Sequence, residues 1–247
     1  MYTPPINPSP INASVKGNSE KKRSIAIVGD SMLKDVKQWN LRKAVPNSNL
    51  FLKCFPGAKS SDMVDYVKPS MRNNPDLILC HFGTNDLRSE QSPVQIADAI
   101  INVASKLKSG TNEVVVFSII NRGDGYNEKA RSVNSYIVKL CQERNLVFLD
   151  NNNIGLNHLQ RGGHWGGLHL NISGTGIFKN NIVNIINCWY GKAYAGVTSA
   201  QDAAQSNSSP TVDPQETDGE LSIGDVKSFY FYFYFYFYCN QRIPIEK

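Results

Sequence analysis

Short apolar runs alternate with helix-length segments over the central part of the chain, a pattern typical of βαβ units around a parallel sheet. The runs that we expect to form strands are residues 24–28, 49–54, 77–82, 113–119 and 146–149. The third run is apolar on both faces apart from His81, as a central parallel strand should be. The pattern therefore predicts an α/β domain with a five-stranded parallel sheet.

Helical periodicity and capping signals predict helices between these strands. The clearest signal is Ser92, a good N-cap that precedes a first-turn proline and an apolar stripe with helical spacing. The other helices that we expect cover about residues 32–39, residues 60–67 with Ser60 or Ser61 as the cap, a long segment after Asn127, and about residues 173–186.

The two ends of the chain have a different composition from the centre. Residues 1–22 are rich in Pro, Asn and Ser, and they have too few large apolar groups to offset the entropy cost of ordering them. Residues 189–247 are of low complexity, and residues 229–238 are five Phe-Tyr pairs that look like a translated simple repeat. We therefore expect one folded domain over residues 23–188, between a disordered leader and a disordered tail.

Composition and charge exclude several classes of protein. No apolar run of 18 residues could span a membrane, and the first residues lack the basic start and apolar stretch of a secretory signal, so we expect a cytoplasmic protein. The net charge of +5 is dispersed, and no basic patch or motif favours a nucleic-acid partner. The cysteines show no metal-ligand spacing and read as free thiols: Cys54, Cys80, Cys141, Cys188 and Cys239.

Residues able to carry chemistry follow the predicted strands. Gly29-Asp30-Ser31 ends the first strand, Gly57 follows the second, and Gly83-Thr84-Asn85-Asp86 ends the third. His169 lies in a loop before the last helix. Because ligands of open parallel sheets bind beyond the carboxyl ends of the strands, we expect these residues to share one site.

These residue types fit acyl transfer, which needs a hydroxyl nucleophile, a base to take its proton, and donors aimed at the developing oxyanion. Ser31 at the start of a helix would gain a backbone N–H and a positive dipole end. Gly57 can bring its own N–H close to a substrate because no side chain intervenes. Asn85 supplies a side-chain amide as a third donor.

The four blocks, in this order, resemble the SGNH (GDSL-type) hydrolase family over about residues 24–186. They are Gly29-Asp30-Ser31, Gly57, Gly83-Thr84-Asn85-Asp86 and Leu168-His169-Leu170-Asn171. The resemblance implies a flavodoxin-like fold, a three-layer α/β/α sandwich. It also implies an enzyme that hydrolyses small esters through an acyl-enzyme, without a metal or an organic cofactor.

The same resemblance assigns roles to individual residues. Ser31 is the implied nucleophile and His169 its base, while the oxyanion hole is formed by the N–H groups of Ser31 and Gly57 and by the Asn85 side chain. Asp30 and Asp86 read as supporting carboxylates that bond backbone groups near the site.

One position departs from the family pattern. The family usually places an Asp three residues before the histidine, and here that residue is Gly166. The triad is reduced to a Ser–His dyad unless a backbone carbonyl of residues 162–167, or Asp150 after the fifth strand, holds the imidazole.

Two functions remain open from the sequence. The first is a serine esterase acting on small acyl or acetyl esters. The second is a catalytically degenerate SGNH-like domain that binds a ligand or a protein partner, similar to domains carried by some retrotransposon-encoded proteins; Gly166 favours it.

Arg122-Gly123-Asp124, after the fourth strand, either contacts an anionic substrate or braces its loop. The oligomeric state is not indicated.

Overall fold

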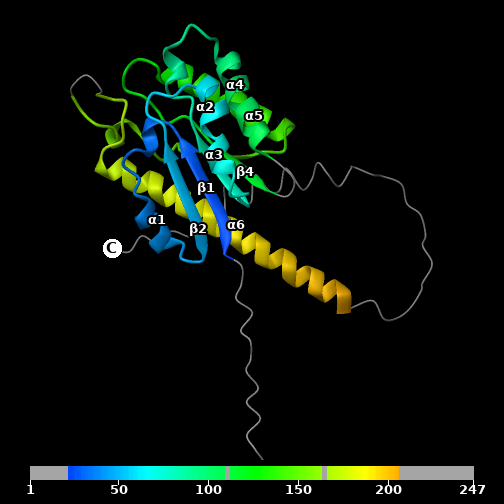
Figure 1. The fold of residues 1–247 in the computed structure, drawn as a ribbon. Coiled ribbons are helices and arrows are strands. Elements are labelled where there is room, and N and C mark those ends of the chain that lie inside the picture. Colours follow the sequence, from blue (N-terminus) through cyan, green and yellow to red (C-terminus); the bar gives the residue numbers. More distant parts are fainter. Residues whose placement is uncertain (1–21, 109–111, 163–165, 206–247) are drawn as a thin grey trace, which may run out of the picture.

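The fold is an all-parallel five-stranded sheet between two layers of helices, seen in a computed structural model that describes residues 22–108, 112–162 and 166–205 (Figure 1). The strands are β1 (Arg23–Gly29), β2 (Ser48–Cys54), β3 (Leu77–His81), β4 (Glu113–Phe117) and β5 (Val147–Leu149). Their order across the sheet is β2-β1-β3-β4-β5, and every neighbouring pair is parallel. This is the flavodoxin-like order, so the predicted fold class is confirmed.

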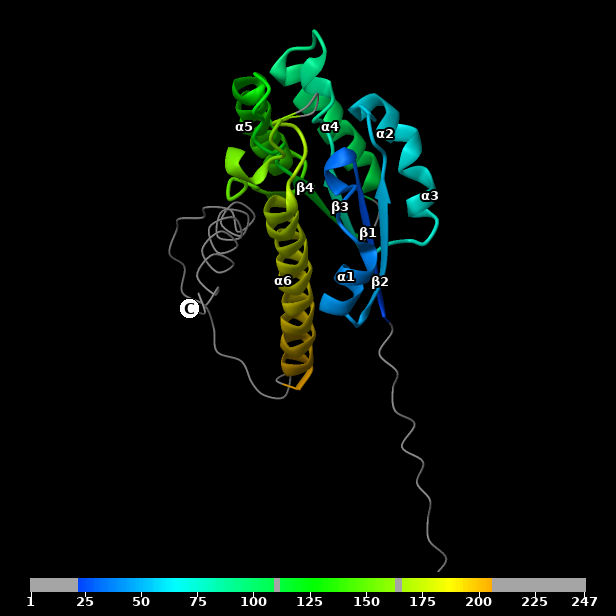
Figure 2. The same cartoon turned by 90° about the vertical axis from the view of Figure 1, so that its left-hand side faces the viewer.

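Helices cover both faces of the sheet. The α-helices are α1 (Gln38–Ala44), α2 (Ser60–Tyr66), α3 (Lys68–Met71), α4 (Pro93–Leu107), α5 (Asn127–Glu143) and α6 (Ile172–Gln205). Three short 3-10 turns are η1 (Ser31–Leu33), η2 (Asp86–Arg88) and η3 (Leu156–His158). Figures 1 and 2 show α1 and α6 on one face of the sheet and α2, α3, α4 and α5 on the other.

Alternate side chains along the strands belong to two separate apolar clusters, one on each face of the sheet. Ala26 and Val28 of β1 point toward the cluster that includes α4 and α5, whereas Ile25 and Ile27 point toward the cluster that includes α1 and α6. All four side chains are buried. Burial of both faces explains why the strands read as continuous apolar runs.

The predicted helix over residues 32–39 is wrong. The Asp30 side chain accepts a hydrogen bond from the Met32 N–H and caps only the short turn η1, after which Lys37 is extended (φ −89°, ψ 120°) and α1 begins at Gln38. Met32 and Val36 are both buried, so the chain between the two helical segments follows the core.

Two predicted boundaries also differ from the structure. β4 ends at Phe117 rather than at residue 119, because the Asn134 side chain bonds both the N–H and the carbonyl of Ile119 at 2.8 Å. α2 begins at Ser60 after Lys59, so neither predicted serine is the cap; the Lys59 N–H instead donates to Asp62.

The last helix continues past the predicted domain boundary at residue 188. α6 runs to Gln205, and Trp189 and Tyr190 pack against the core of the sheet. The Arg23 guanidinium lies 4.9 Å from the centre of the Trp189 ring. Part of the segment expected as tail is therefore helical, while the predicted leader up to residue 21 and the Phe-Tyr repeat lie outside the described residues.

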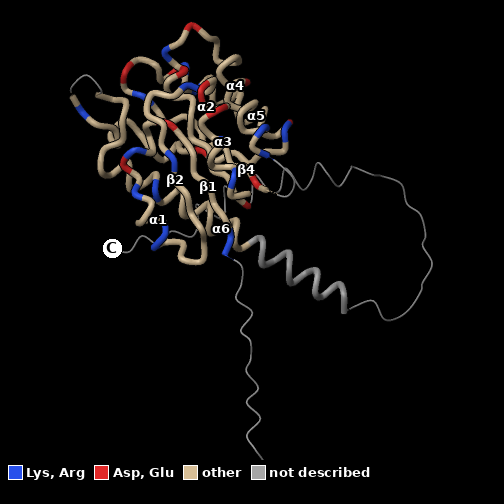
Figure 3. Tube along the Cα trace, viewed as in Figure 1, with Lys and Arg blue, Asp and Glu red and all other residues tan. Residues whose placement is uncertain are grey.

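The charged residues are spread over the described part of the chain. Figure 3 shows Lys and Arg distributed along the trace rather than gathered on one element. Within the described ranges, no helix is long and apolar enough to cross a membrane.

Candidate active site

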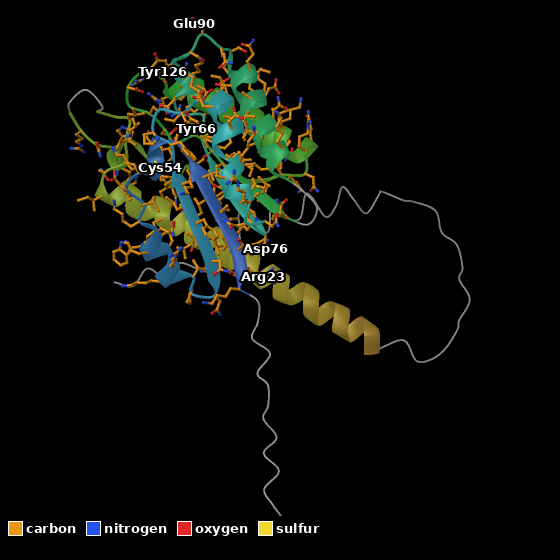
Figure 4. The ribbon with its side chains drawn as sticks, viewed as in Figure 1. Arg23, Cys54, Tyr66, Asp76, Glu90 and Tyr126 are labelled. Atoms are coloured by element: carbon orange, nitrogen blue, oxygen red, sulfur yellow. The ribbon has the colours of Figure 1, made fainter. Side chains whose placement is uncertain are left out.

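The candidate site lies at the carboxyl ends of β1, β2 and β3. Figure 4 labels Cys54 at this end of β2, and Arg23 and Asp76 toward the opposite end of the sheet. The Phe55 N–H donates to the Gly29 carbonyl at 2.8 Å, and the Asp30 N–H donates to the His81 carbonyl at 2.9 Å. These bonds tie the three loops together where the strand order reverses, which is the usual ligand position in such sheets.

Ser31 sits on a sharp turn that only glycine permits at its entrance. A Cβ on Gly29 would lie 2.3 Å from the His81 carbonyl oxygen, so β1 can approach β3 this closely only without a side chain. Ser31 is the first residue of η1 and is 7% exposed. Because η1 has three residues, the expected dipole of a full helix is absent and the Ser31 N–H is the local donor.

Asp30 is a fully buried carboxylate beneath this turn. It accepts hydrogen bonds from the Met32 N–H (3.1 Å) and the Thr84 N–H (3.3 Å). Burial by itself raises the pKa of Asp30, but the nearby His81 and the two backbone donors outweigh that effect, and the pKa lies below its usual value. Asp30 thereby links the Ser31 turn to the block that contains Asn85.

His81 is the buried neighbour of Asp30. Its Nδ1 lies 3.5 Å from Asp30 Oδ1, a separation that favours electrostatic contact over a good hydrogen bond. Its ring packs edge-on against Phe178, with centroids 5.0 Å apart. His81 is therefore a buried core histidine whose ring lies between Asp30 and Phe178.

The two other candidate oxyanion donors are held next to each other. Pro56 and Gly57 occupy the centre of a turn closed by the Ala58 N–H and the Phe55 carbonyl (3.2 Å), and Gly57 has φ +81°, which L side chains rarely adopt. The Asn85 Nδ2 donates to the Ala58 carbonyl at 2.8 Å. This bond uses one of the two amide hydrogens and fixes the direction of the other.

Asp86 braces the same region from below. Its two carboxylate oxygens lie 3.1 and 3.0 Å from the Ser60 N–H at the start of α2. The side chain is 2% exposed, and burial raises the pKa of Asp86 above its usual value.

His169 is carried by a closed loop between η3 and α6. Leu159 and Leu170 form an antiparallel bridge at its base, and the Gln160 N–H donates to the His169 carbonyl at 2.7 Å. His169 is partly buried, and its Nδ1 atom is inaccessible to water. Burial, followed by the positive charge of Lys34, lowers the pKa of His169 below 6.5.

The position of the missing acid has no room for a side chain. A Cβ on Gly166 would lie 2.9 Å from the carbonyl oxygen of Gly162. Asp150, the alternative acid, accepts a hydrogen bond from the Ser118 Oγ at 3.0 Å at the β4–β5 side of the sheet. No group of three or more His, Cys, Asp or Glu side chains that could hold a metal occurs within the described residues.

A flavodoxin-like, five-stranded parallel sheet whose loops meet at its switch point defines the class: a three-layer α/β protein. Residues 30–177 match the GDSL-like Lipase/Acylhydrolase family. Because the match covers more than half of the chain, the protein belongs to this family.

Solved structures of family members have the same fold. A lipase/acylhydrolase from Enterococcus faecalis is 17% identical, with a TM-score of 0.57, over 66% of this chain and 95% of that one. The esterase EstA from a Pseudoalteromonas species is 14% identical, with a TM-score of 0.56, over 68% and 99% of the two chains. Est24, a carbohydrate acetylesterase from Sinorhizobium meliloti, is 14% identical, with a TM-score of 0.55, over 68% and 100%. A search of curated protein sequences gave no match.

Proposed function

We propose that the protein is a serine esterase that hydrolyses small acyl or acetyl esters with Ser31 as nucleophile and His169 as base. The observation that carries the proposal is that hydrogen bonds join the loops of Ser31, Gly57 and Asn85 at the switch point of the sheet. The Phe55–Gly29 and Thr84–Asp30 bonds join the Ser31 turn to the other two loops, and the Asn85–Ala58 bond joins those two to each other. Membership of an acylhydrolase family supports the same chemistry.

The proposed reaction has two halves. The Ser31 Oγ attacks the ester carbonyl carbon while His169 takes the hydroxyl proton, and the carbonyl oxygen becomes an oxyanion that accepts hydrogen bonds from the Ser31 N–H, the Gly57 N–H and the Asn85 Nδ2. Collapse of the tetrahedral intermediate breaks the ester C–O bond, and His169 returns the proton to the leaving alcohol. A water molecule then attacks the acyl-enzyme by the same route and releases the acid.

The buried Nδ1 of His169 supports assignment of Nε2 to the proton transfer, because the nitrogen that faces the protein is the one an orienting acceptor would hold. The neutral imidazole is the active form of a base. Since the pKa of His169 is lowered, we expect the acidic limb of the pH profile to lie below pH 6.5.

The substrate class is proposed from the relatives and from the site. Among the similar structures, one is described as a carbohydrate acetylesterase and another as an esterase inhibited by monoethylphosphonate. An acetyl or short acyl group on a polar alcohol is therefore the first substrate to test.

The test compares the full-length chain with Ser31→Ala and His169→Ala on p-nitrophenyl acetate and butyrate between pH 5 and 9. A serine-reactive phosphonate should label Ser31, as read by peptide mass spectrometry, and both variants should lose at least about 10³-fold in kcat. Ser135→Ala, on the exposed side of α5, is the matched control and should keep full activity. Folded variants with the activity of the parent protein would refute the esterase.

The second candidate is a domain that binds an ester-bearing or other polar ligand without turnover. Gly166 favours it, since the usual acid is missing and its position is closed by the Gly162 backbone. An inert parent protein that binds the esters with an affinity reduced by Asn85→Ala would establish this alternative.

A further inference from the structure

Arg122 is a buried cation beyond β4, and each of its three guanidinium nitrogens donates a hydrogen bond. Its Nη1 donates to the Thr84 carbonyl at 2.7 Å, and its Nε donates to Asp124 Oδ1 at 2.8 Å. Its Nη2 bonds the other oxygen of Asp124. The guanidinium also lies 5.3 Å from the centre of the Tyr126 ring. Because the guanidinium is buried and each of its three nitrogens has a protein partner, the structure favours bracing over contact with an anionic substrate.

The first thing that Arg122 braces is the block that contains Asn85. Its partner Thr84 directly precedes Asn85, and both backbone groups of Thr84 are hydrogen-bonded. The Thr84 N–H donates to Asp30 under the Ser31 turn, while the Thr84 carbonyl accepts from Arg122. One buried chain of bonds therefore runs from the candidate nucleophile, through the oxyanion block, to Arg122.

The second thing that Arg122 braces is the loop that carries His169. The next residue, Gly123, donates its N–H to the Gly167 carbonyl at 2.8 Å. The two glycines are so close that a Cβ on Gly167 would lie 2.8 Å from the Gly123 Cα. The Gly167 N–H in turn donates to the Gln160 carbonyl, and the Gln160 N–H donates to the His169 carbonyl.

We propose that Arg122 is a positioning residue that fixes the His169 loop relative to the oxyanion block. It does so through its bond to the Thr84 carbonyl and through the Gly123–Gly167 contact beside it. Asp124 takes part in this positioning, because it accepts hydrogen bonds from two guanidinium nitrogens of Arg122 and one from Arg88 at 3.2 Å. The proposal rests on the proposed esterase function for its kinetic consequences and on geometry alone for its structural ones.

Arg122 also acts on His169 through its charge. Burial lowers the pKa of His169, Lys34 and Arg122 lower it further, and Asp30 and Asp35 oppose this effect. Removal of the Arg122 charge should therefore raise the pKa of His169, whereas a lysine at the same position should leave the pKa nearly unchanged.

The experiment compares Arg122→Met, Arg122→Lys and Asp124→Asn in the full-length protein. Arg131→Met is the matched control, because Arg131 is an exposed α5 arginine paired only at the surface with Glu128. For Arg122→Met we expect kcat on p-nitrophenyl acetate to fall about 10- to 100-fold per active site, titrated with the phosphonate, because a displacement near 1 Å has an effect of this size. KM should change less than about threefold, and the acidic limb of the pH profile should move to higher pH.

Arg122→Lys should restore the position of the acidic limb while recovering only part of kcat, since lysine keeps the charge but not the fork. Two outcomes would overturn the proposal: a kcat per active site equal to that of the parent protein, or a loss confined to KM, which would indicate a substrate contact.

A readout that needs no turnover separates this proposal from the esterase. Amide hydrogen exchange at Gly123 and Gly167, and the NMR titration of the His169 ring, both follow the loop directly. We expect faster exchange and a higher His169 pKa in Arg122→Met even if the parent protein hydrolyses no ester. Unchanged exchange and an unchanged titration would refute the positioning role whatever the activity.

Discussion

Gly166→Asp puts back the acid that the family usually carries, and the structure predicts that this change fails to restore a triad. A Cβ at this position would lie 2.9 Å from the carbonyl oxygen of Gly162, 3.1 Å from its nitrogen and 3.2 Å from its carbonyl carbon. These are backbone atoms, which cannot rotate away. Gly166 itself has no positive φ, so the obstacle is steric and not a strained backbone.

The size of the effect follows from this overlap. Forced contacts of this kind cost about 1–3 kcal/mol, and each kcal/mol lowers Tm by about 2–4 °C in a chain of this length. We therefore expect Tm to fall by about 2–12 °C in Gly166→Asp. Gly166→Ala adds the same Cβ, so its Tm should fall by a similar amount. Gly176→Ala, in the first turns of α6, is the control, since its Cβ meets no atom within 4 Å and alanine favours a helix.

The assay pairs thermal unfolding with kcat on p-nitrophenyl acetate. We expect kcat in Gly166→Asp to stay at or below the parent value, because a displaced loop also displaces His169. In serine proteases, replacing the triad acid lowers kcat about 10⁴-fold, so even partial restoration would be visible. An unchanged Tm together with a tenfold or greater rise in kcat would refute the reasoning and show that the loop accommodates the carboxylate.

Three further predictions test the surroundings of the site. Gly29→Ala should lower the free energy of unfolding by about 3 kcal/mol, measured by denaturant titration, because its Cβ would lie 2.3 Å from the His81 carbonyl oxygen; an unchanged midpoint would contradict this packing. Burial raises the pKa of the Cys54 thiol from 9.0 to about 11, so at pH 8 its thiolate fraction is about 100-fold lower than that of a free thiol. A disulfide reagent should therefore label Cys54 slowly, as followed by mass spectrometry. Labelling as fast as that of a free thiol would exclude the shift. The Arg122 hydrogen bond lowers the pKa of Asp124 below 3.8, so Asp124 adds stability that is present above pH 3.8 and is lost as pH falls through its folded-state pKa. Asp124→Asn should therefore flatten the dependence of Tm on pH between about 5 and 2. A curve parallel to that of the parent protein would rule this out.

The parts of the fold that local sequence determines could be predicted. The strands read as apolar runs because both sheet faces are covered, and the start of α4 follows from a reciprocal pair of bonds, in which the Ser92 N–H donates to Gln95 Oε1 at 2.8 Å and the Gln95 N–H donates to Ser92 Oγ. The membership of the family also followed from the four blocks in order.

The parts that depend on contacts distant in sequence could not be predicted. The break between η1 and α1 follows from the burial of Val36, and the end of β4 follows from the Asn134 side chain, which bonds Ile119 from 15 residues further along the chain. α6 continues through the expected boundary, where Trp189 and Tyr190 pack against the core. Capping residues and periodicity carry no information about such contacts.

Arg122 illustrates the same limit within the candidate site. Its sequence signal, an arginine after an apolar strand with an aspartate two residues later, fits a substrate contact and a brace equally well. Only the burial of the guanidinium and its bond to the Thr84 carbonyl separate the two readings. A buried arginine whose guanidinium nitrogens all bond the protein should be tested as a positioning residue before a binding one.

The absence of the acid and the packing of the His169 loop are two aspects of one arrangement. Gly166 lies against the backbone of Gly162, and Gly167 lies against the backbone of Gly123, so consecutive residues just before His169 are held by backbone contact on two sides. A side chain at Gly166 would displace the Gly162 backbone within the loop, and a side chain at Gly167 would push the loop away from Gly123. An acid three residues before the histidine would therefore require a different loop, and not only a different residue. It follows that second-site changes that widen this loop, rather than Gly166→Asp alone, are the route by which a triad could be built into this chain.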